Sequence, residues 1–262
     1  MQIGKSRAAT SGICHAEADR IEVRGRDLTS ELMGRIGFTD YFYLLLTGRE
    51  ASKEQRFFLD LLLVAIAEHG LVPTVQAARM TLAADPGSLQ GAVAAGLLGA
   101  GPVILGTSEL CGRLLLDADA KVVAGSKPDA AALALARAIR EAGGKVPGFG
   151  HPIHKPVDPR AVRILALAEE RGVAGRHVAM ARHMEKAVAK AWGRPLVMNV
   201  SMPIAAVLLD LDFPAAMIKA IPLLARTASL LAHLAEEQKN PIGFQMAGSA
   251  EAAVAYERDS DA

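Results

Sequence analysis

The stretch from Lys145 to Arg160 holds the residues of this chain that are best suited to chemistry. Gly148 and Gly150 have no Cβ, so the backbone beside them can approach a ligand closely. His151 can move a proton near neutral pH, and Arg160 carries a planar, always charged guanidinium that fits a carboxylate or a phosphate. The stretch predicts a site for an anionic substrate whose reaction needs proton transfer, with an ordinary loop as the alternative.

Outside that stretch, polar residues stand in apolar or glycine-rich surroundings at three places: Glu68-His69, Asn199-Val200-Ser201, and Arg226 with His233. His69 has a structural alternative, because a cation near a helix C-terminus is stabilised by the helix dipole. A buried arginine such as Arg226 is costly without an anionic partner. That partner is either a protein carboxylate, Glu236 or Glu237, or the carboxylate of a bound ligand.

The composition favours a helical protein in a reducing compartment. Hydrophobic residues make up 51% of the 262 residues and aromatic ones only 4%, so the core should be aliphatic and alanine-rich. A net charge of +1 gives no support for a nucleic-acid-binding surface. Cys14 and Cys111 show no metal-ligand or redox spacing, which favours a cytoplasmic location. Met1–Ser11 lacks the apolar segment of a secretory signal.

One apolar run, from Gly91 to Leu110, is about as long as a membrane span. It contains five glycines and a proline, and it lacks flanking aromatic or basic anchors. It is therefore interpreted as a buried helix followed by a glycine-rich turn, and the chain is expected to be soluble, with no membrane partner.

The coarse pattern predicts an all-α protein with little sheet. Residues 14–27 are expected to form an irregular or hairpin-like entry, and no alternating run is long enough for a central strand. Ser52 is a plausible N-cap, and Asp158-Pro159 predicts another helix start. Helices are expected over 28–33, 41–46, 57–67, around Arg79, and over 89–100, 130–142, 160–171, 176–191, 204–209 and 213–238, the last kinked or divided at Pro222.

Several motifs, in this order along the chain, resemble the citrate synthase superfamily. They are Arg24-Gly25-Arg26-Asp27, Leu44-Leu45-Leu46-Thr47-Gly48, Glu68-His69, Val146-Pro147-Gly148-Phe149-Gly150-His151, Asp158-Pro159-Arg160, Asn199-Val200, Ala225-Arg226-Thr227, and Ala232-His233 with Glu236-Glu237-Gln238. Together they cover nearly the whole chain. The resemblance implies a large helical domain (1–106 with 215–262) and a small one (107–214) on the coenzyme A side, paired as a homodimer or higher homo-oligomer.

The resemblance also implies roles for individual residues. His151 would exchange a proton with the substrate's carbonyl or hydroxyl oxygen, and His69, Arg160 and Arg226 would hold carboxylates. The backbone around Val146, Pro147, Gly148, Phe149 and Gly150 would face the adenine of coenzyme A, with Lys155 also on the coenzyme side. A basic stripe of Arg182, His183, Lys186 and Lys190 is either a solvated face or a contact for the coenzyme's phosphates. The family needs no metal and binds no permanent cofactor, since the coenzyme A thioester is substrate or product.

Departures from the family's synthases point to a particular reaction. Ile104 stands where those enzymes have the histidine that bonds the enolate oxygen, and Ser201 replaces their catalytic aspartate. A serine hydroxyl cannot act as a carboxylate base, because its pKa is too high. The family's synthases also have an arginine, late in the sequence, that reaches across the dimer to the substrate. It has no clear counterpart in this chain, although Lys155, Lys239 or Arg258 could substitute. The chain is also short, as in citryl-CoA lyases.

The expected activity is therefore that of a citryl-CoA lyase. Citryl-CoA, or a relative such as citramalyl-CoA, would be cleaved to acetyl-CoA and a 2-oxo acid, with His151 as base and Ser201 or backbone N–H groups meeting the enolate oxygen. A condensing enzyme with an unusual acceptor and a non-catalytic homologue that binds coenzyme A and dicarboxylates are the alternatives.

Overall fold

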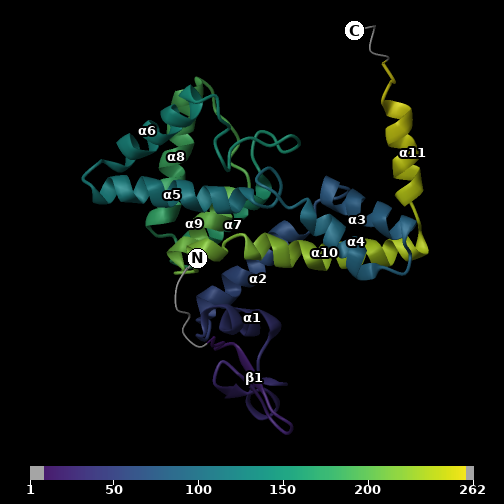
Figure 1. The fold of residues 1–262 in the computed structure, drawn as a ribbon. Coiled ribbons are helices and arrows are strands. Elements are labelled where there is room, and N and C mark those ends of the chain that lie inside the picture. The colour runs from purple at the N-terminus through teal and green to yellow at the C-terminus, as the bar shows by residue number, and fades with distance from the viewer. Residues whose placement is uncertain (1–8, 258–262) are drawn as a thin grey trace. The chain divides into compact units, whose positions relative to one another are not determined.

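The computed structural model describes residues 9–257, and the chain splits into two compact units, Met1–Asp60 and Leu61–Ala262. Arg258 lies outside the described residues, so its suggested role is not addressed by the structure. Helices dominate both units, and only three short strands occur among the described residues (Figure 1). The predicted all-α class with little sheet is confirmed.

The first unit begins with the hairpin-like entry that the sequence predicts. Strands β1 (Cys14–Ala16), β2 (Ile21–Val23) and β3 (Arg26–Asp27) form an antiparallel meander in the order β1-β2-β3. A short π-helix (η1, Leu28–Leu32) and α1 (Phe38–Thr47) follow. Val23, Leu32 and Leu44 form their common core.

Helix α2 (Lys53–Ala67) starts at the predicted N-cap and runs into the second unit. Ser52 Oγ accepts the amide N–H of Gln55, and Gln55 Oε1 accepts the amide N–H of Ser52. This reciprocal pair is a capping box, which satisfies two amide donors that the first helical turn leaves unpaired. The helix ends immediately before Glu68 and His69, so both residues lie in a turn.

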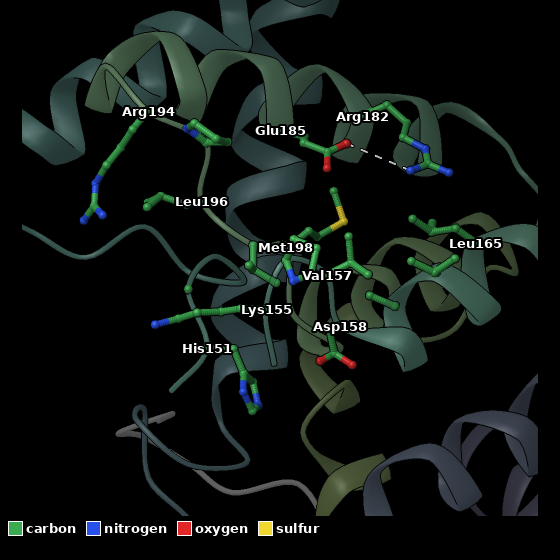
Figure 2. Close-up of a pocket in the computed structure, with 16 residues that line it drawn as sticks. His151, Lys155, Val157, Asp158, Leu165, Arg182, Glu185, Arg194, Leu196 and Met198 are labelled. Carbon is green, nitrogen blue, oxygen red and sulfur yellow. Dashed lines mark ion pairs between the residues drawn. The ribbon is translucent and has the colours of Figure 1, made fainter. Parts of the chain in front are cut away.

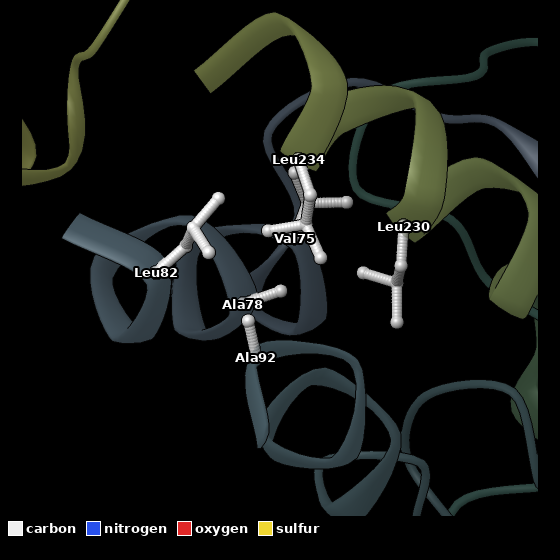
Figure 3. Packing of buried hydrophobic residues seen from close by; sticks show 6 residues of the cluster. All are labelled: Val75, Ala78, Leu82, Ala92, Leu230 and Leu234. Carbon is white, nitrogen blue, oxygen red and sulfur yellow. The ribbon is translucent and has the colours of Figure 1, made fainter. Parts of the chain in front are cut away.

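In the second unit, α3 (Pro73–Ala84), α4 (Leu89–Leu98) and α10 (Ala220–Lys239) pack closely together. Their buried cluster consists of Val75, Ala78, Leu82, Ala92, Leu230 and Leu234 (Figure 3). A Cβ at Gly96 of α4 would lie 2.7 Å from Leu230 Cδ1 and 2.8 Å from Thr74 O. A small residue is therefore needed there for the helices to approach this closely.

A second group of helices comprises α5 (Thr107–Val123), α6 (Pro128–Glu141), α7 (Pro159–Glu170), α8 (Arg176–Trp192) and α9 (Ser201–Asp210). Helix α9 is buried from Met202 to Leu209 and contacts α5, α7 and α8. The α5–α9 group lies within residues 107–214, whose assignment to a small domain remains a prediction. The assignment of 1–106 with 215–262 to a large domain remains a prediction.

The end of the chain differs from the sequence-based expectation in its helix boundaries. The expected helix 213–238 is divided into a short 3-10 helix (η2, Ala215–Met217) and α10. Pro222 lies in the first turn of α10, where its missing N–H removes no helical hydrogen bond, so it does not kink the helix. Helices α5 and α11 (Gly243–Ala253) were not among the expected elements.

By length and composition, one helical stretch among residues 9–257, Ala215–Lys239, could cross a membrane. It carries Arg226, His233, Glu236 and Glu237, and its apolar face packs into the α3–α4 core. The core helix of a soluble protein passes the same test of length and composition. The run Gly91–Leu110 is instead α4, a turn over 99–106, and the start of α5.

A buried ion pair joins α3, α10 and the start of α11. Arg79 Nε donates to Glu237 Oε2 over 2.6 Å, and both side chains are about 2% exposed. Glu237 Oε1 also accepts the amide N–H groups of Ile242 and Gly243, which opens α11. Burial raises the pKa of Glu237, but the Gly243 amide and Arg79 outweigh it, so the pKa is lowered overall.

We predict that Arg79→Met lowers the free energy of unfolding by about 3–5 kcal/mol, because it leaves the Glu237 carboxylate buried and unpaired. Urea denaturation measures this change. Glu236→Gln is the matched control: Glu236 also bonds Arg79 but is exposed, so its loss should cost less than about 1 kcal/mol. Equal effects of the two variants would contradict the assignment.

Candidate active site

The turn after α2 places His69 through the carboxylate of Glu68. Glu68 Oε1 accepts the amide N–H groups of His69 and Gly70. Its Oε2 accepts Ser229 Oγ–H over 2.6 Å and lies 3.0 Å from His233 Nε2. Burial raises the pKa of Glu68, but its hydrogen bonds with Ser229, Gly70 and His233 outweigh it and lower the pKa. Glu68 therefore stays ionised and holds the turn against α10.

His233 connects this turn to the buried ion pair described above. Its Nδ1 lies 3.3 Å from Nη1 of Arg79, which can only donate, so Nδ1 accepts. Its Nε2 then carries the hydrogen and donates to Glu68. Both nitrogens of a neutral imidazole are thereby satisfied. A continuous hydrogen-bonded chain runs from the start of α11 to the backbone of His69.

The glycine-rich loop before His151 is fixed by backbone contacts. Gly148 and Gly150 have φ angles of +79° and +90°, which side chains other than glycine rarely adopt. A Cβ at Gly148 would lie 2.8 Å from Cys111 Sγ and 2.9 Å from Met202 Cβ. Asn199 donates its amide N–H to Gly148 O and its Nδ2–H to Gly150 O. The loop that leads into His151 is therefore tied to the segment before α9.

The hydrogen bonds of His151 define which ring nitrogen carries the proton. Its Nδ1 accepts the amide N–H of Ile153 over 3.1 Å and that of His154 over 2.9 Å. A nitrogen that accepts cannot be protonated, so Nε2 carries the hydrogen of the neutral ring. Burial lowers the pKa of His151, as do His154, Arg160 and His69, whereas Asp158 raises it. His151 is therefore a neutral Nε2–H donor.

Three imidazoles meet at this point, and the sequence-based argument assigned a role to only two of them. His69 Nε2 lies 3.2 Å from His154 Nε2. The rings of His151 and His154 stack with centroids 4.3 Å apart, and the His69 and His151 centroids are 5.5 Å apart. The i, i+3 spacing in His151-Pro-Ile-His154 was the available signal for His154. The contact with His69, 85 residues away, could not be inferred from it.

Arg160 is held by the N-cap of its own helix. The Asp158 carboxylate accepts the Arg160 amide N–H, Nε–H over 3.0 Å and Nη2–H over 2.9 Å. It also accepts the amide N–H of Val200, just before α9. Burial raises the pKa of Asp158, but its bonds with Arg160 outweigh this and lower it. The guanidinium is therefore oriented, with its Nη1 not engaged by Asp158.

The structure answers the question of the partner of Arg226. Glu236 and Glu237 both pair with Arg79, so neither neutralises Arg226. The side chain of Arg226 is buried, and its Nε and Nη1 have no hydrogen-bond partner among the described residues. Burial lowers its pKa, and only the charge of Glu68 opposes this. Because unpaired buried charge is costly, this arrangement favours the binding of an anion.

Ser201 is less directly connected to this cluster. It is the first residue of α9, half-buried, and its amide N–H donates to Asn199 Oδ1 over 3.1 Å. Within residues 9–257, no hydrogen bond or ring contact joins Ser201 to His69, His151 or His154. Its link to them is indirect, through Asn199 and Gly150 O.

The histidine cluster suits an anion better than a metal ion. One nitrogen from each of His69, His151 and His154 lies within 4.8 Å of the other two. A metal-bound histidine normally donates its second N–H to a carboxylate or a carbonyl. His151 has the opposite arrangement, because its Nδ1 accepts two amide N–H groups. The charges of Arg160 and Arg226, which act on His69, also oppose a dication.

A pocket of about 620 Å³ lies beside His151 on the α7–α8 side. Val157, Leu165, Leu196 and Met198 supply apolar lining, and Lys155, Arg182, Arg194 and Glu185 supply charged groups (Figure 2). Of the predicted coenzyme-facing residues, Gly150 and Lys155 line the pocket. Val146, Gly148 and Phe149 are buried, so any ligand contact of theirs would come from the backbone.

A family model described as "Citrate synthase, C-terminal domain" matches residues 35–243. The chain is also 31% identical over 186 residues to "Putative citrate synthase 2" of Mycobacterium bovis and of Mycobacterium tuberculosis, a match that covers 69% of this chain and 47% of theirs. The chain thus spans about half the length of these curated relatives.

Solved structures show the same fold over nearly the whole chain. The citryl-CoA lyase from Hydrogenobacter thermophilus is 26% identical with a TM-score of 0.84, and 98% of this chain and 97% of that one are covered. The ATP citrate lyase from Methanothrix soehngenii, in complex with citrate and coenzyme A, is 21% identical with a TM-score of 0.77, covering 99% of this chain and 43% of that one. By its matched residues and its fold, the chain belongs to the citrate synthase family.

Proposed function

We propose that the chain is a citryl-CoA lyase-like enzyme, which cleaves citryl-CoA or a related carboxylated 3-hydroxyacyl-CoA to acetyl-CoA and a 2-oxo acid. The observation that carries the proposal is the buried guanidinium of Arg226, which lacks a protein anion at two of its nitrogens and lies near His69. The match to a citryl-CoA lyase over nearly the full length of both chains supports the choice of reaction.

The carboxylates of the substrate would be bound by His69, Arg160 and Arg226. The charges of Arg160 and Arg226 both lower the pKa of His69. Among the described residues, no carboxylate side chain bonds the His69 ring. Asp158 occupies only Nε and Nη2 of Arg160, so Nη1 remains for a ligand. Two guanidinium groups and an imidazole on one small surface match a ligand with two carboxylates.

The hydrogen bonds of His151 support a role as a donor better than the expected role as the base that takes the hydroxyl proton. Because Nδ1 accepts two amide N–H groups, Nε2 already carries a hydrogen and cannot accept another. His151 would instead donate Nε2–H to the substrate oxygen as negative charge develops on it during cleavage. Removal of the hydroxyl proton then falls to another group of the site.

Residue types at two positions support cleavage over synthesis. Ile104, in the turn between α4 and α5, offers no donor to an enolate oxygen, and Ser201 offers no carboxylate to deprotonate acetyl-CoA. Cleavage needs neither group as a base, and Ser201 or backbone N–H groups at the start of α9 would meet the departing enolate. A condensing reaction remains the alternative, which the similarity to citrate synthases favours.

The coenzyme A moiety would occupy the pocket beside His151. Its volume lies in the usual range for small-molecule sites, about 300–1,000 Å³. Lys155, Arg182 and Arg194 are placed to meet phosphates, and Val157, Leu196 and Met198 to meet an adenine ring. This would give Arg182 of the basic stripe its second interpretation, as a coenzyme contact. Homo-oligomerisation and a cytoplasmic location remain predictions.

Turnover of citryl-CoA tests the proposal directly. We predict that the purified protein releases acetyl-CoA and oxaloacetate from citryl-CoA, as measured by a coupled assay. The variant His151→Ala should lower kcat by about two to three orders of magnitude. His15→Gln, at a histidine of β1 whose side chain is 74% exposed, is the control and should leave turnover unchanged. Thiol release from acetyl-CoA and oxaloacetate, without citryl-CoA cleavage above the His151→Ala background, would establish the condensing alternative instead.

Arg226→Met should separate stability from function. Removing a buried, unpaired charge should raise the free energy of unfolding by about 1–3 kcal/mol, because an apolar side chain of similar length needs no partner. The same variant should weaken dicarboxylate binding by roughly two orders of magnitude, because a charge-assisted bond to the ligand is lost. Chemical denaturation and calorimetric titration with malate measure the two effects. A destabilised variant with unchanged affinity would show that Arg226 is structural.

A further inference from the structure

The hydrogen bond between His69 and His154 is a feature that the proposed function does not yet use. Their Nε2 atoms lie 3.2 Å apart, so one ring donates and the other accepts. Two neutral imidazoles carry two N–H groups and two lone pairs, and one of each is used in this bond. The two rings therefore retain one nitrogen lone pair that can accept a proton.

His151 cannot serve the same purpose, although it stacks on His154. Protonation would place a hydrogen on Nδ1, which already accepts the amide N–H groups of Ile153 and His154. Two favourable hydrogen bonds would become repulsive contacts. Any proton that the cluster gains is therefore directed to the His69–His154 pair.

Cations dominate the surroundings of the pair in the ligand-free protein. Burial lowers the pKa of His69, and so do Arg160, His154 and Arg226. The nearby anions are engaged elsewhere: Asp158 pairs with Arg160, and Glu68 accepts from Ser229, His233 and two amides. The lowered pKa of His69 favours its neutral form until a ligand supplies negative charge.

We propose that the His69–His154 pair is the proton acceptor of this site, and that a ligand with two carboxylates binds together with a proton shared between these rings. The proposal rests on the proposed function, since it assumes that the dicarboxylate lies among His69, Arg160 and Arg226. It adds His154 to the ligand-binding residues and gives the pair a role distinct from that of His151.

The chemical consequence is a destination for the hydroxyl proton. In the fraction of substrate complexes in which the pair has not taken up a proton, the O–H bond breaks and an N–H bond forms on the pair. The hydroxyl oxygen becomes the carbonyl of the 2-oxo acid, and the electrons of the broken carbon–carbon bond pass to the thioester enolate. His151 donates Nε2–H to the same oxygen throughout. A bound dianion raises the proton affinity of the pair, which brings the base towards the working pH.

Because binding of the dicarboxylate is coupled to binding of a proton, the affinity for the ligand depends on pH. The ligand favours the protonated pair, so its affinity is highest below the pKa of the free protein. Affinity falls as pH rises, by at most about tenfold per pH unit for one linked proton, until the pH passes the pKa of the complex. At neutral pH, binding should take up a fraction of a proton, approaching one.

Calorimetric titration with malate, whose carboxyl groups are ionised at neutral pH, tests the proposal. The binding enthalpy is measured at one pH in phosphate and in Tris, because their different ionisation enthalpies reveal the protons taken up. We expect uptake of roughly half to one proton by the wild type. His154→Gln keeps a hydrogen-bonding group but cannot titrate, and should bind malate without proton uptake and with little dependence on pH. His15→Gln should behave as the wild type.

The outcomes separate this proposal from the proposed function. Malate binding whose enthalpy is independent of the buffer would overturn the proton-sharing role and leave the carboxylate site intact. Proton uptake that persists in His154→Gln would likewise overturn it. If neither malate nor oxaloacetate bound to the wild type, the dicarboxylate site itself would be contradicted. The wild-type measurement in two buffers decides the question even if the His154 variant does not fold.

Discussion

The central physical constraint in this protein is the burial of the Arg226 guanidinium without enough negative charge around it. The carboxylates closest in sequence, Glu236 and Glu237, bind Arg79, and Glu68 is shared among four hydrogen-bond donors. A protein gains no stability from such an arrangement. It becomes favourable when an anion enters, and the neighbouring imidazoles and Arg160 indicate an anion with more than one carboxylate.

The rest of the second unit keeps this charge imbalance in place. Asp158 joins the start of α7 to the residue before α9 and orients Arg160. Glu237 joins α3, α10 and α11, and His233 continues that contact to Glu68 and the His69 turn. Each carboxylate neutralises a structural partner and is thereby unavailable to the pocket. Pre-organised cations of this kind reduce the reorganisation that ligand binding would otherwise require.

Much of the fold could be predicted from local signals. Ser52, Asp158 and Gly48 mark helix ends by capping chemistry that operates within a few residues, and the structure places helix boundaries beside them. Pro222 was misinterpreted because a proline at the first turn and one in the interior look alike without knowledge of the helix start. Helix α11 has no strong apolar stripe, and its start depends on Glu237, so its own sequence carried little signal.

The sequence was a better guide to which residues lie in the candidate site than to the contacts that decide their roles. Motif spacing identified His69, His151, Arg160 and Arg226, which the structure brings together in the second unit. It could not reveal that two backbone amides occupy Nδ1 of His151, nor that His154 meets His69, because both depend on the three-dimensional path of the loop. These two observations are the basis on which we propose that His151 donates a hydrogen bond and does not act as the base.

A crystal structure of the protein with malate and coenzyme A tests the central claim most directly. The account predicts one malate carboxylate bonded to Nε and Nη1 of Arg226, beside the ring of His69. Malate bound elsewhere, with Arg226 in a salt bridge to Glu68 that satisfies the same two nitrogens, would contradict it.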